Sequence, residues 1–250
     1  MSNFHGPWLV DIVAAASAPL QEAVARRPLV SQSVSAAIAE VGEKSACLAL
    51  VGNGAAEIAS ISFRRMAERF GDDGDIRDVL LARDDLSPAI RQFLVRAVSD
   101  RLNAMVVDRA WLPEVRARTV TREACDRATI AIAAESETQD LPALVEHLRV
   151  TGQLTTALLL RAVCAGNMAF FQAALSVLTG VPERRIAGLV RGRRMNGLRA
   201  AYTRAGLPTY AFDAFCAVLD VWRRATDAGP EERYRFIAAN VGTVLARYRQ

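Results

Sequence analysis

The spacing of apolar residues in this chain limits it to helical folds. From Ser87 to Asp108 they recur at intervals of three and four, as on one face of an α-helix; they are Ile90, Phe93, Leu94, Ala97, Val98, Leu102 and Met105. Ser87 is a good N-cap and Pro88 suits the first helical position, so the pattern predicts a helix over this range. A second stripe, between Pro208 and Gly229, comprises Phe212, Phe215, Cys216, Leu219 and Trp222. No segment shows the alternation that is typical of a β-strand.

Short breaks separate the helical segments. Glycine directly follows several of the apolar-periodic stretches, where it suits the residue after a helix C-terminus; examples are Gly42, Gly152, Gly166, Gly180 and Gly206. The pattern predicts about a dozen helices of roughly 8–22 residues with short connections, which is typical of stacked helical hairpins. We expect an all-α fold, an α-solenoid of HEAT-like helix pairs followed by a compact helical C-terminal part.

A weak internal repeat favours the solenoid. Aligning residues 24–28, 50–54 and 81–88 brings the end of one helix, a turn and the start of the next helix into register. Because one such unit cannot bury its apolar face alone, neighbouring units are expected to stack into a continuous core. We therefore place HEAT-like repeats in residues 1–110 and a helical C-terminal part in residues 111–250. Residues 106–138 fit no pattern, so their role stays open.

Several of these segments resemble one bacterial family. Residues 50–55, 82–88 and 158–175 look like the family catalogued as domain of unknown function 2336, and residues 178–185, 197–200 and 204–208 extend the resemblance. The most distinctive parts are Phe170-Phe171 and Gly206-Leu207-Pro208, and the resemblance runs from about Pro19 to about Trp222. It implies a HEAT-like α-solenoid in front of a compact helical part, and it supplies no catalytic residues.

Positive charge is concentrated near the C-terminus. The chain has 31 basic and 27 acidic residues and a net charge of +4, and all but one of the basic residues are arginine. No acidic residue occurs between Glu183 and Asp213, whereas the segment 184–204 contains seven arginines: Arg184, Arg185, Arg191, Arg193, Arg194, Arg199 and Arg204. These seven are the candidate partner-binding residues.

Three interpretations of the arginines stay open. They could form a solvated helical face whose aliphatic stems cover apolar surface. They could form a docking surface for an acidic protein partner, because a patch of one sign steers and orients association. They could also neutralise the phosphates of a nucleic acid, although few aromatic residues lie nearby for base stacking.

The residues that common catalytic and metal sites need are scarce. Only His5 and His147 are histidines, and His147 is expected on a helix surface or flank. The four cysteines lie far apart among apolar neighbours and are expected to be reduced core residues. The sequence contains no nucleophile elbow, zinc-protease, Walker or dinucleotide-binding motif. The acidic loop around Asp73 lacks the spacing of a calcium loop and predicts a helix N-cap instead. We expect no enzyme, no metal and no cofactor.

The remaining features suggest where the protein acts and with what. No apolar run approaches the roughly 18–20 residues of a membrane span, and the first residues do not resemble a signal sequence, so we expect a cytoplasmic protein that does not enter a membrane. The tryptophans Trp8, Trp111 and Trp222 are expected mainly in the core.

The sequence favours a non-catalytic protein-interaction module, an adaptor or regulatory scaffold for an acidic protein partner. A helical-repeat nucleic-acid-binding protein is the alternative. A homodimer could form because the N-terminal part is acidic and the C-terminal part basic.

Overall fold

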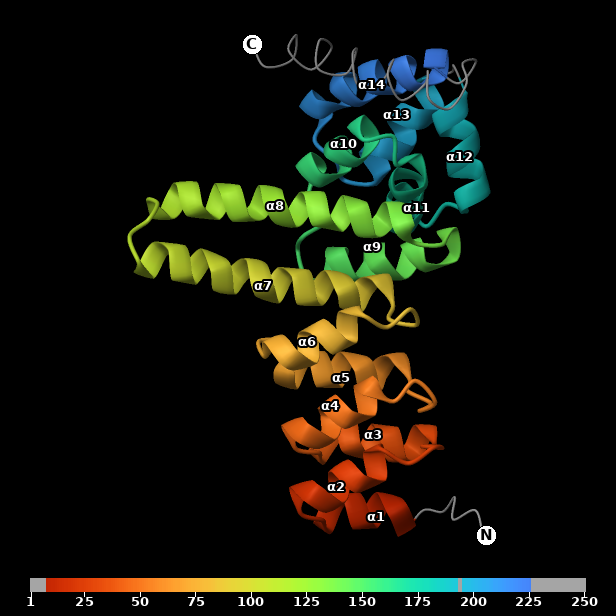
Figure 1. The fold of residues 1–250 in the computed structure, drawn as a ribbon. Coiled ribbons are helices and arrows are strands. Elements are labelled where there is room, and N and C mark those ends of the chain that lie inside the picture. Colours follow the sequence, from red (N-terminus) through yellow and green to blue (C-terminus); the bar gives the residue numbers. More distant parts are fainter. Residues whose placement is uncertain (1–7, 193–194, 226–250) are drawn as a thin grey trace. The chain divides into compact units, whose positions relative to one another are not determined.

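The computed structural model describes residues 8–192 and 195–225, and within these ranges every regular element is helical (Figure 1). It contains fourteen α-helices and two 3-10 helices there and no strand, which confirms the all-α prediction. The chain divides into two compact units, residues 1–125 and residues 126–250. The division lies within one long helix, α8 (Glu114–Glu135), whereas the sequence analysis places it at residue 110.

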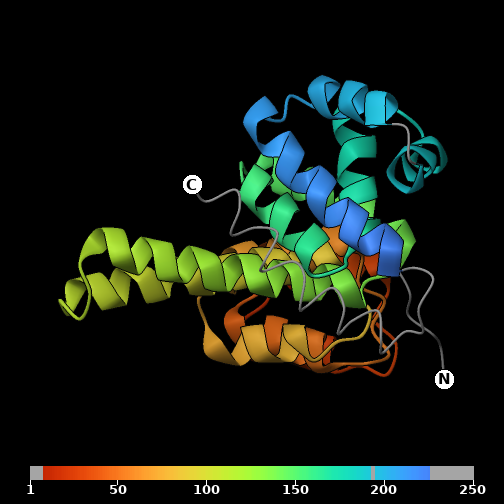
Figure 2. The ribbon, with the colours of Figure 1, turned by 90° about the horizontal axis from the view of Figure 1, so that it is seen from above.

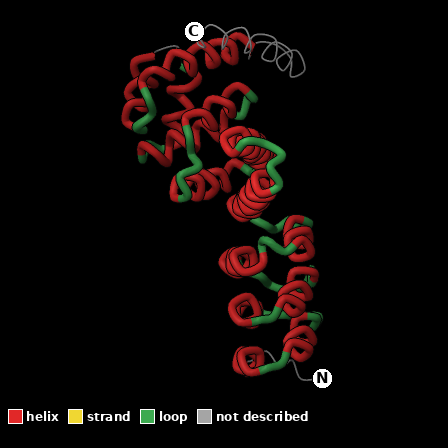
Figure 3. Tube along the Cα trace, turned by 90° about the vertical axis from the view of Figure 1, so that its left-hand side faces the viewer, coloured by secondary structure: helices red, strands yellow, loops and turns green. Residues whose placement is uncertain are grey.

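The first unit arranges its helices in two layers. Its first six helices are α1 (Trp8–Ala15), α2 (Ala18–Ala25), α3 (Gln32–Val41), α4 (Lys44–Gly52), α5 (Ser60–Phe70) and α6 (Gly74–Leu81). The odd-numbered helices pack on one another in chain order and the even-numbered helices do the same, so they form two columns in Figure 3. One apolar core lies between the layers, and its largest fully buried side chains include Ile38, Leu50, Phe63 and Met66.

Side chains from one turn hold the end of the helix before it. The Asn53 amide, just after α4, donates hydrogen bonds to the carbonyl oxygens of Ala25 (2.9 Å) and Arg27 (2.8 Å) at the end of α2. The Arg83 guanidinium, just after α6, donates to the carbonyl oxygens of Val51 (3.0 Å) and Asn53 (3.1 Å) at the end of α4. The last carbonyl groups of a helix have no partner inside it, so these links satisfy them. The three turns that align in the sequence are therefore joined in series.

The start of α7 (Pro88–Asp108) agrees with the prediction, with Ser87 as the N-cap residue. The acidic loop also behaves as predicted. The Asp73 carboxylate caps α6 by accepting hydrogen bonds from the amides of Asp75 and Ile76, and it lies 2.6 Å from the Lys44 ammonium. The hydrogen bond from Lys44 is the main reason that the pKa of Asp73 lies below its ordinary value.

The second unit is built around one buried helix. Its elements after α8 are η1 (Thr138–Asp140), α9 (Leu141–Val150), α10 (Thr156–Cys164), α11 (Met168–Thr179), α12 (Glu183–Arg191), α13 (Met195–Arg204), η2 (Thr209–Ala211) and α14 (Phe212–Ala225). Helix α11 packs against α9, α10, α12 and α13, and α10 lies beside α14 (Figure 2). The Phe171 ring of α11 stacks on the Phe215 ring, with 5.3 Å between the ring centroids. The Tyr202 ring meets the Phe212 and Phe215 rings edge-on, at centroid distances of 5.0 and 5.4 Å. Such aromatic pairs stabilise a core beyond the area that they bury.

Two expectations about single residues are wrong. Trp8 and Trp111 are 43% and 60% exposed, while Trp222 packs partly buried against the core of the second unit. Trp111 lies in the turn after α7, where its ring stacks on the guanidinium of Arg109. His147 is buried rather than on a surface, because it shares its helix with the core residues Leu144 and Leu148 and that helix packs against α11.

Candidate functional site

Three of the seven predicted arginines form an exposed cationic face. Arg184, Arg185 and Arg191 lie on α12 and are exposed, while Ile186 and Val190 of the same helix are buried. None of the three guanidinium groups pairs with an acidic side chain in residues 8–192 or 195–225. Arg184 and Arg191 are two helical turns apart and so share one side of α12. We call these three residues the α12 arginine face.

The other predicted arginines do not join this face. The Arg199 guanidinium lies over the Phe212 ring at 4.5 Å and 3.9 Å from the Asp213 carboxylate, which ties it to the start of α14. Arg204 is exposed at the end of α13, where a cation is favourable beside the last carbonyl groups. Arg193 and Arg194 lie outside the described residues. The arginines that form one cluster in the sequence therefore do not form one surface among the described residues.

One arginine that the sequence analysis did not select positions α12. The Arg223 guanidinium, from α14, donates two hydrogen bonds to the carbonyl oxygen of Val190, at 3.1 and 2.8 Å, and pairs with Asp220 at 2.7 Å. Its side chain is only 12% exposed. The carbonyl groups at the C-terminal end of α12 are thus held by α14. Arg223 lies four residues after Leu219, which belongs to the predicted apolar stripe, so the sequence spacing could have indicated that Arg223 points toward the core.

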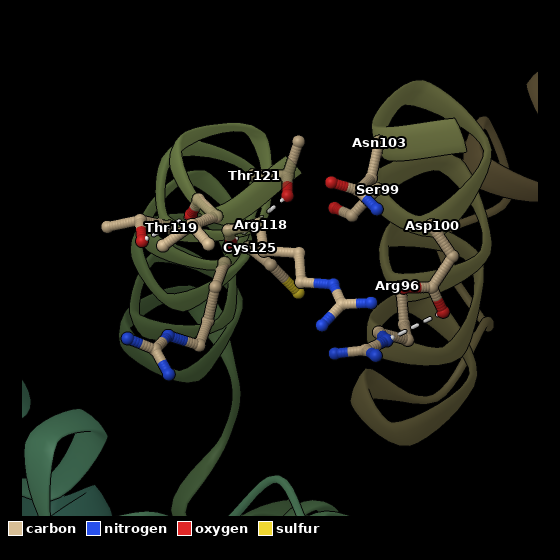
Figure 4. Close-up of a pocket in the computed structure, with 10 residues that line it drawn as sticks. Arg96, Ser99, Asp100, Asn103, Arg118, Thr119, Thr121 and Cys125 are labelled. Atoms are coloured by element: carbon tan, nitrogen blue, oxygen red, sulfur yellow. Dashed lines mark hydrogen bonds and ion pairs between the residues drawn. The ribbon is translucent and has the colours of Figure 1, made fainter. Parts of the chain in front are cut away.

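A polar cleft lies between α7 and the first half of α8, and only its α8 side belongs to the region that fits no sequence pattern (Figure 4). Its volume is about 430 Å³, and side chains of both helices line it: Arg96, Ser99, Asp100, Asn103, Val115, Arg118, Thr119, Thr121, Arg122 and Cys125. Figure 4 shows Ser99 and Asn103 facing Thr121 across the gap. Antiparallel helices usually meet through apolar side chains, so this contact is unusually polar.

The charges in the cleft are largely paired. Arg96 binds Asp100 at 2.8 Å, and Arg118 binds Glu114. Arg122 is exposed and pairs with no acidic side chain in the described part of the chain. The buried amide oxygen of Asn103 has no hydrogen-bond partner. The polar side chains of α7 and α8 thus face each other across the cleft, and most of its charged groups are neutralised by a neighbour on the same helix.

The cysteines lie apart from both features, except for Cys125 at the cleft. All four are free thiols, and burial raises the pKa of Cys47, Cys164 and Cys216 to about 11. Such thiols are protonated at neutral pH and react slowly. In the residues that the structure describes, no three His, Cys, Asp or Glu side chains are grouped so as to hold a metal ion.

A membrane-spanning helix must be both long and apolar. Within the described ranges, no helix combines the length and the apolar character that crossing a bilayer needs.

Comparison with known proteins identifies the family. No curated protein and no solved structure matches the chain. A family model does match, over residues 7–250, and its description is "Uncharacterised protein conserved in bacteria (DUF2336)". The match includes both units and nearly the whole sequence, in agreement with the resemblance carried by residues 158–175 and 204–208. The chain therefore belongs to the DUF2336 family.

Proposed function

We propose that this protein is a non-catalytic interaction module, a cytoplasmic adaptor or regulatory scaffold that binds an acidic protein partner. The observation that carries the proposal is the α12 arginine face. Its three exposed guanidinium groups have no acidic partner in the described residues, so their charge is directed at solvent and at whatever approaches the helix. A patch of one sign raises the association rate with an oppositely charged surface and helps to orient it.

Three exposed arginines of the first unit differ from those of α12, because each has an acidic partner. Arg26 pairs with Glu22, Arg64 with Glu68, and Arg65 with Glu40 and Glu68. These pairs are exposed and locally neutral, so they add little to stability and offer little net charge to a partner. An exposed arginine is therefore not enough to indicate a binding site. Three exposed arginines on the nine-residue helix α12, each without an acidic partner in the described residues, favour an acidic partner there.

We further propose that α1–α7 form a HEAT-like solenoid. The layering of odd and even helices and the serial links through Asn53 and Arg83 support this interpretation. Stacked helix pairs present long surfaces, which such proteins use to hold other proteins. The solenoid would supply an extended binding surface, and the α12 arginine face would supply a separate electrostatic contact.

A charge-matched pair of variants tests the function. In the first, Arg184, Arg185 and Arg191 are replaced by Gln; in the second, Arg26, Arg64 and Arg65 are replaced by Gln, so both lose three positive charges. Each tagged protein is used for affinity capture from extract of its native cells, at low and moderate salt, with and without nuclease. We expect the α12 variant to recover about tenfold less of a nuclease-resistant acidic protein, and the second variant to recover it like the wild type.

Other outcomes would change the conclusion. Equal recovery by the α12 variant and the wild type would refute the electrostatic contact, provided that circular dichroism shows both to be folded. Recovery that disappears with nuclease and falls steeply with salt would instead support nucleic-acid binding.

A further inference from the structure

The α7–α8 hairpin carries several exposed large hydrophobic residues close together in the chain. No side chain from residue 95 to residue 116 is buried. The exposed large hydrophobic residues of the described chain include six between residues 98 and 120: Val98, Leu102, Met105, Trp111, Val115 and Val120. Large contiguous apolar surfaces are rare on monomers and commonly mark sites of association.

Three of these residues continue the core-facing stripe of α7. Ile90 and Leu94 are buried in the core of the first unit, and Val98, Leu102 and Met105 follow them on the same side of the helix. At about 1.5 Å per residue, the 21-residue α7 is about 31 Å long and the 11-residue α5 beneath it about 16 Å. Helix α7 therefore extends beyond α5 and α6 (Figure 1), and its stripe is exposed where the supporting helices end.

Helix α8 does not cover this stripe. It faces α7 across the polar cleft, on the side of Ser99 and Asn103. Each of those residues lies one position after a stripe residue, which is about 100° further around the helix. Val98, Leu102 and Met105 are thus left between 37% and 44% exposed.

We propose that the stripe is covered by the same stripe of a second copy of this chain, with the two α7 helices antiparallel about a two-fold axis. In that arrangement Leu102 of each copy packs against Met105 of the other copy. The two α8 helices flank the pair, so two hairpins form a four-helix bundle. A two-fold interface must be self-complementary, and the stripe meets that requirement.

Charge complementarity argues for a second copy over an unrelated protein. Arg101 and Asp108 lie seven residues apart, on one flank of the stripe. Antiparallel packing of Leu102 on Met105 brings Arg101 of each copy opposite Asp108 of the other. Asp108 has no acidic or basic partner among the described residues, and Arg101 is held beside the stripe by a hydrogen bond of 2.6 Å to the Asp72 carbonyl oxygen. The inference uses no residue of α12, so it stands apart from the proposed function.

Solution mass tests the apolar contact. We expect light scattering or sedimentation equilibrium of the full chain to give twice its 27.1 kDa mass, and Leu102→Glu to give the single-chain mass. The control is Ile61→Glu, at an exposed apolar position of α5 in the same unit, which should stay dimeric. A wild type that is monomeric at every concentration, or a Leu102→Glu variant that stays dimeric, would overturn the proposal.

Exchanging the charges tests the orientation. Arg101→Asp places two acidic residues opposite each other at both ends of the interface, and Asp108→Arg places two basic residues there, so each variant alone should dimerise about tenfold more weakly. Mixed in equal amounts, the two variants should form a heterodimer. At one end of it the introduced aspartate faces the introduced arginine, and at the other end the original pair of Arg101 and Asp108 is kept.

The same mixture separates a lost contact between copies from a folding defect. A fold defect caused by the lost contact with Asp72 would not be repaired by mixing. Failure of the mixture to associate better than either variant would contradict the antiparallel arrangement.

Discussion

At the scale of single residues, Arg83 links two turns of the first unit. Its side chain is 12% exposed; it bonds the carbonyl oxygens of Val51 and Asn53, and its pairing with Asp85 lowers the pKa of that carboxyl group. We expect Arg83→Ala to lower the free energy of unfolding by about 2–3 kcal/mol, because it leaves partly buried acceptors without a donor. Arg65→Ala, which removes an exposed ion pair, should cost under about 1 kcal/mol. Urea unfolding of both variants compares them, and equal losses would show that the Arg83 links contribute nothing special.

At the scale of elements, two glycines of the second unit should respond oppositely to the same change. Gly180 ends α11 with φ +69°, a left-handed conformation that strains any residue with a Cβ atom. Gly188 lies within α12, where an added Cβ would meet nothing within 4 Å. We expect Gly180→Ala to destabilise the protein by about 1–2 kcal/mol and Gly188→Ala to stabilise it by about 0.5–1 kcal/mol. Thermal unfolding measures both, and shifts of the same sign would contradict this account of the two helices.

At the scale of the whole molecule, the described residues form two separate apolar cores. One comprises residues between Leu9 and Leu94, and the other residues between Ala133 and Val221. Leu50→Ala and Phe171→Ala each remove a fully buried side chain and should cost about 2–5 kcal/mol. Because the cores share no residue, we expect each variant to speed amide hydrogen exchange mainly in its own unit. Peptide-resolved exchange by mass spectrometry measures this, and equal acceleration in both units by either variant would show that they unfold together.

The helices could be predicted from the sequence, because the signals that start and end a helix act over a few residues. The first turn of α7 at Ser87-Pro88, the Asp73 cap of α6 and the buried face of α14 could all be predicted from local spacing, as could the buried start of the α7 stripe at Ile90 and Leu94. Which side chains a partner can reach depends instead on how the helices pack. Arg184 and Arg199 look equivalent in the sequence and both are exposed, yet Arg199 stacks on Phe212 and lies near Asp213, whereas Arg184 has no acidic partner in the described residues. Leu94 and Val98 belong to one stripe of α7, yet Leu94 is buried and Val98 is 39% exposed. The difference arises because α7 extends beyond α5. Exposure depends on segments that are remote in the sequence, and no local pattern records where those segments end.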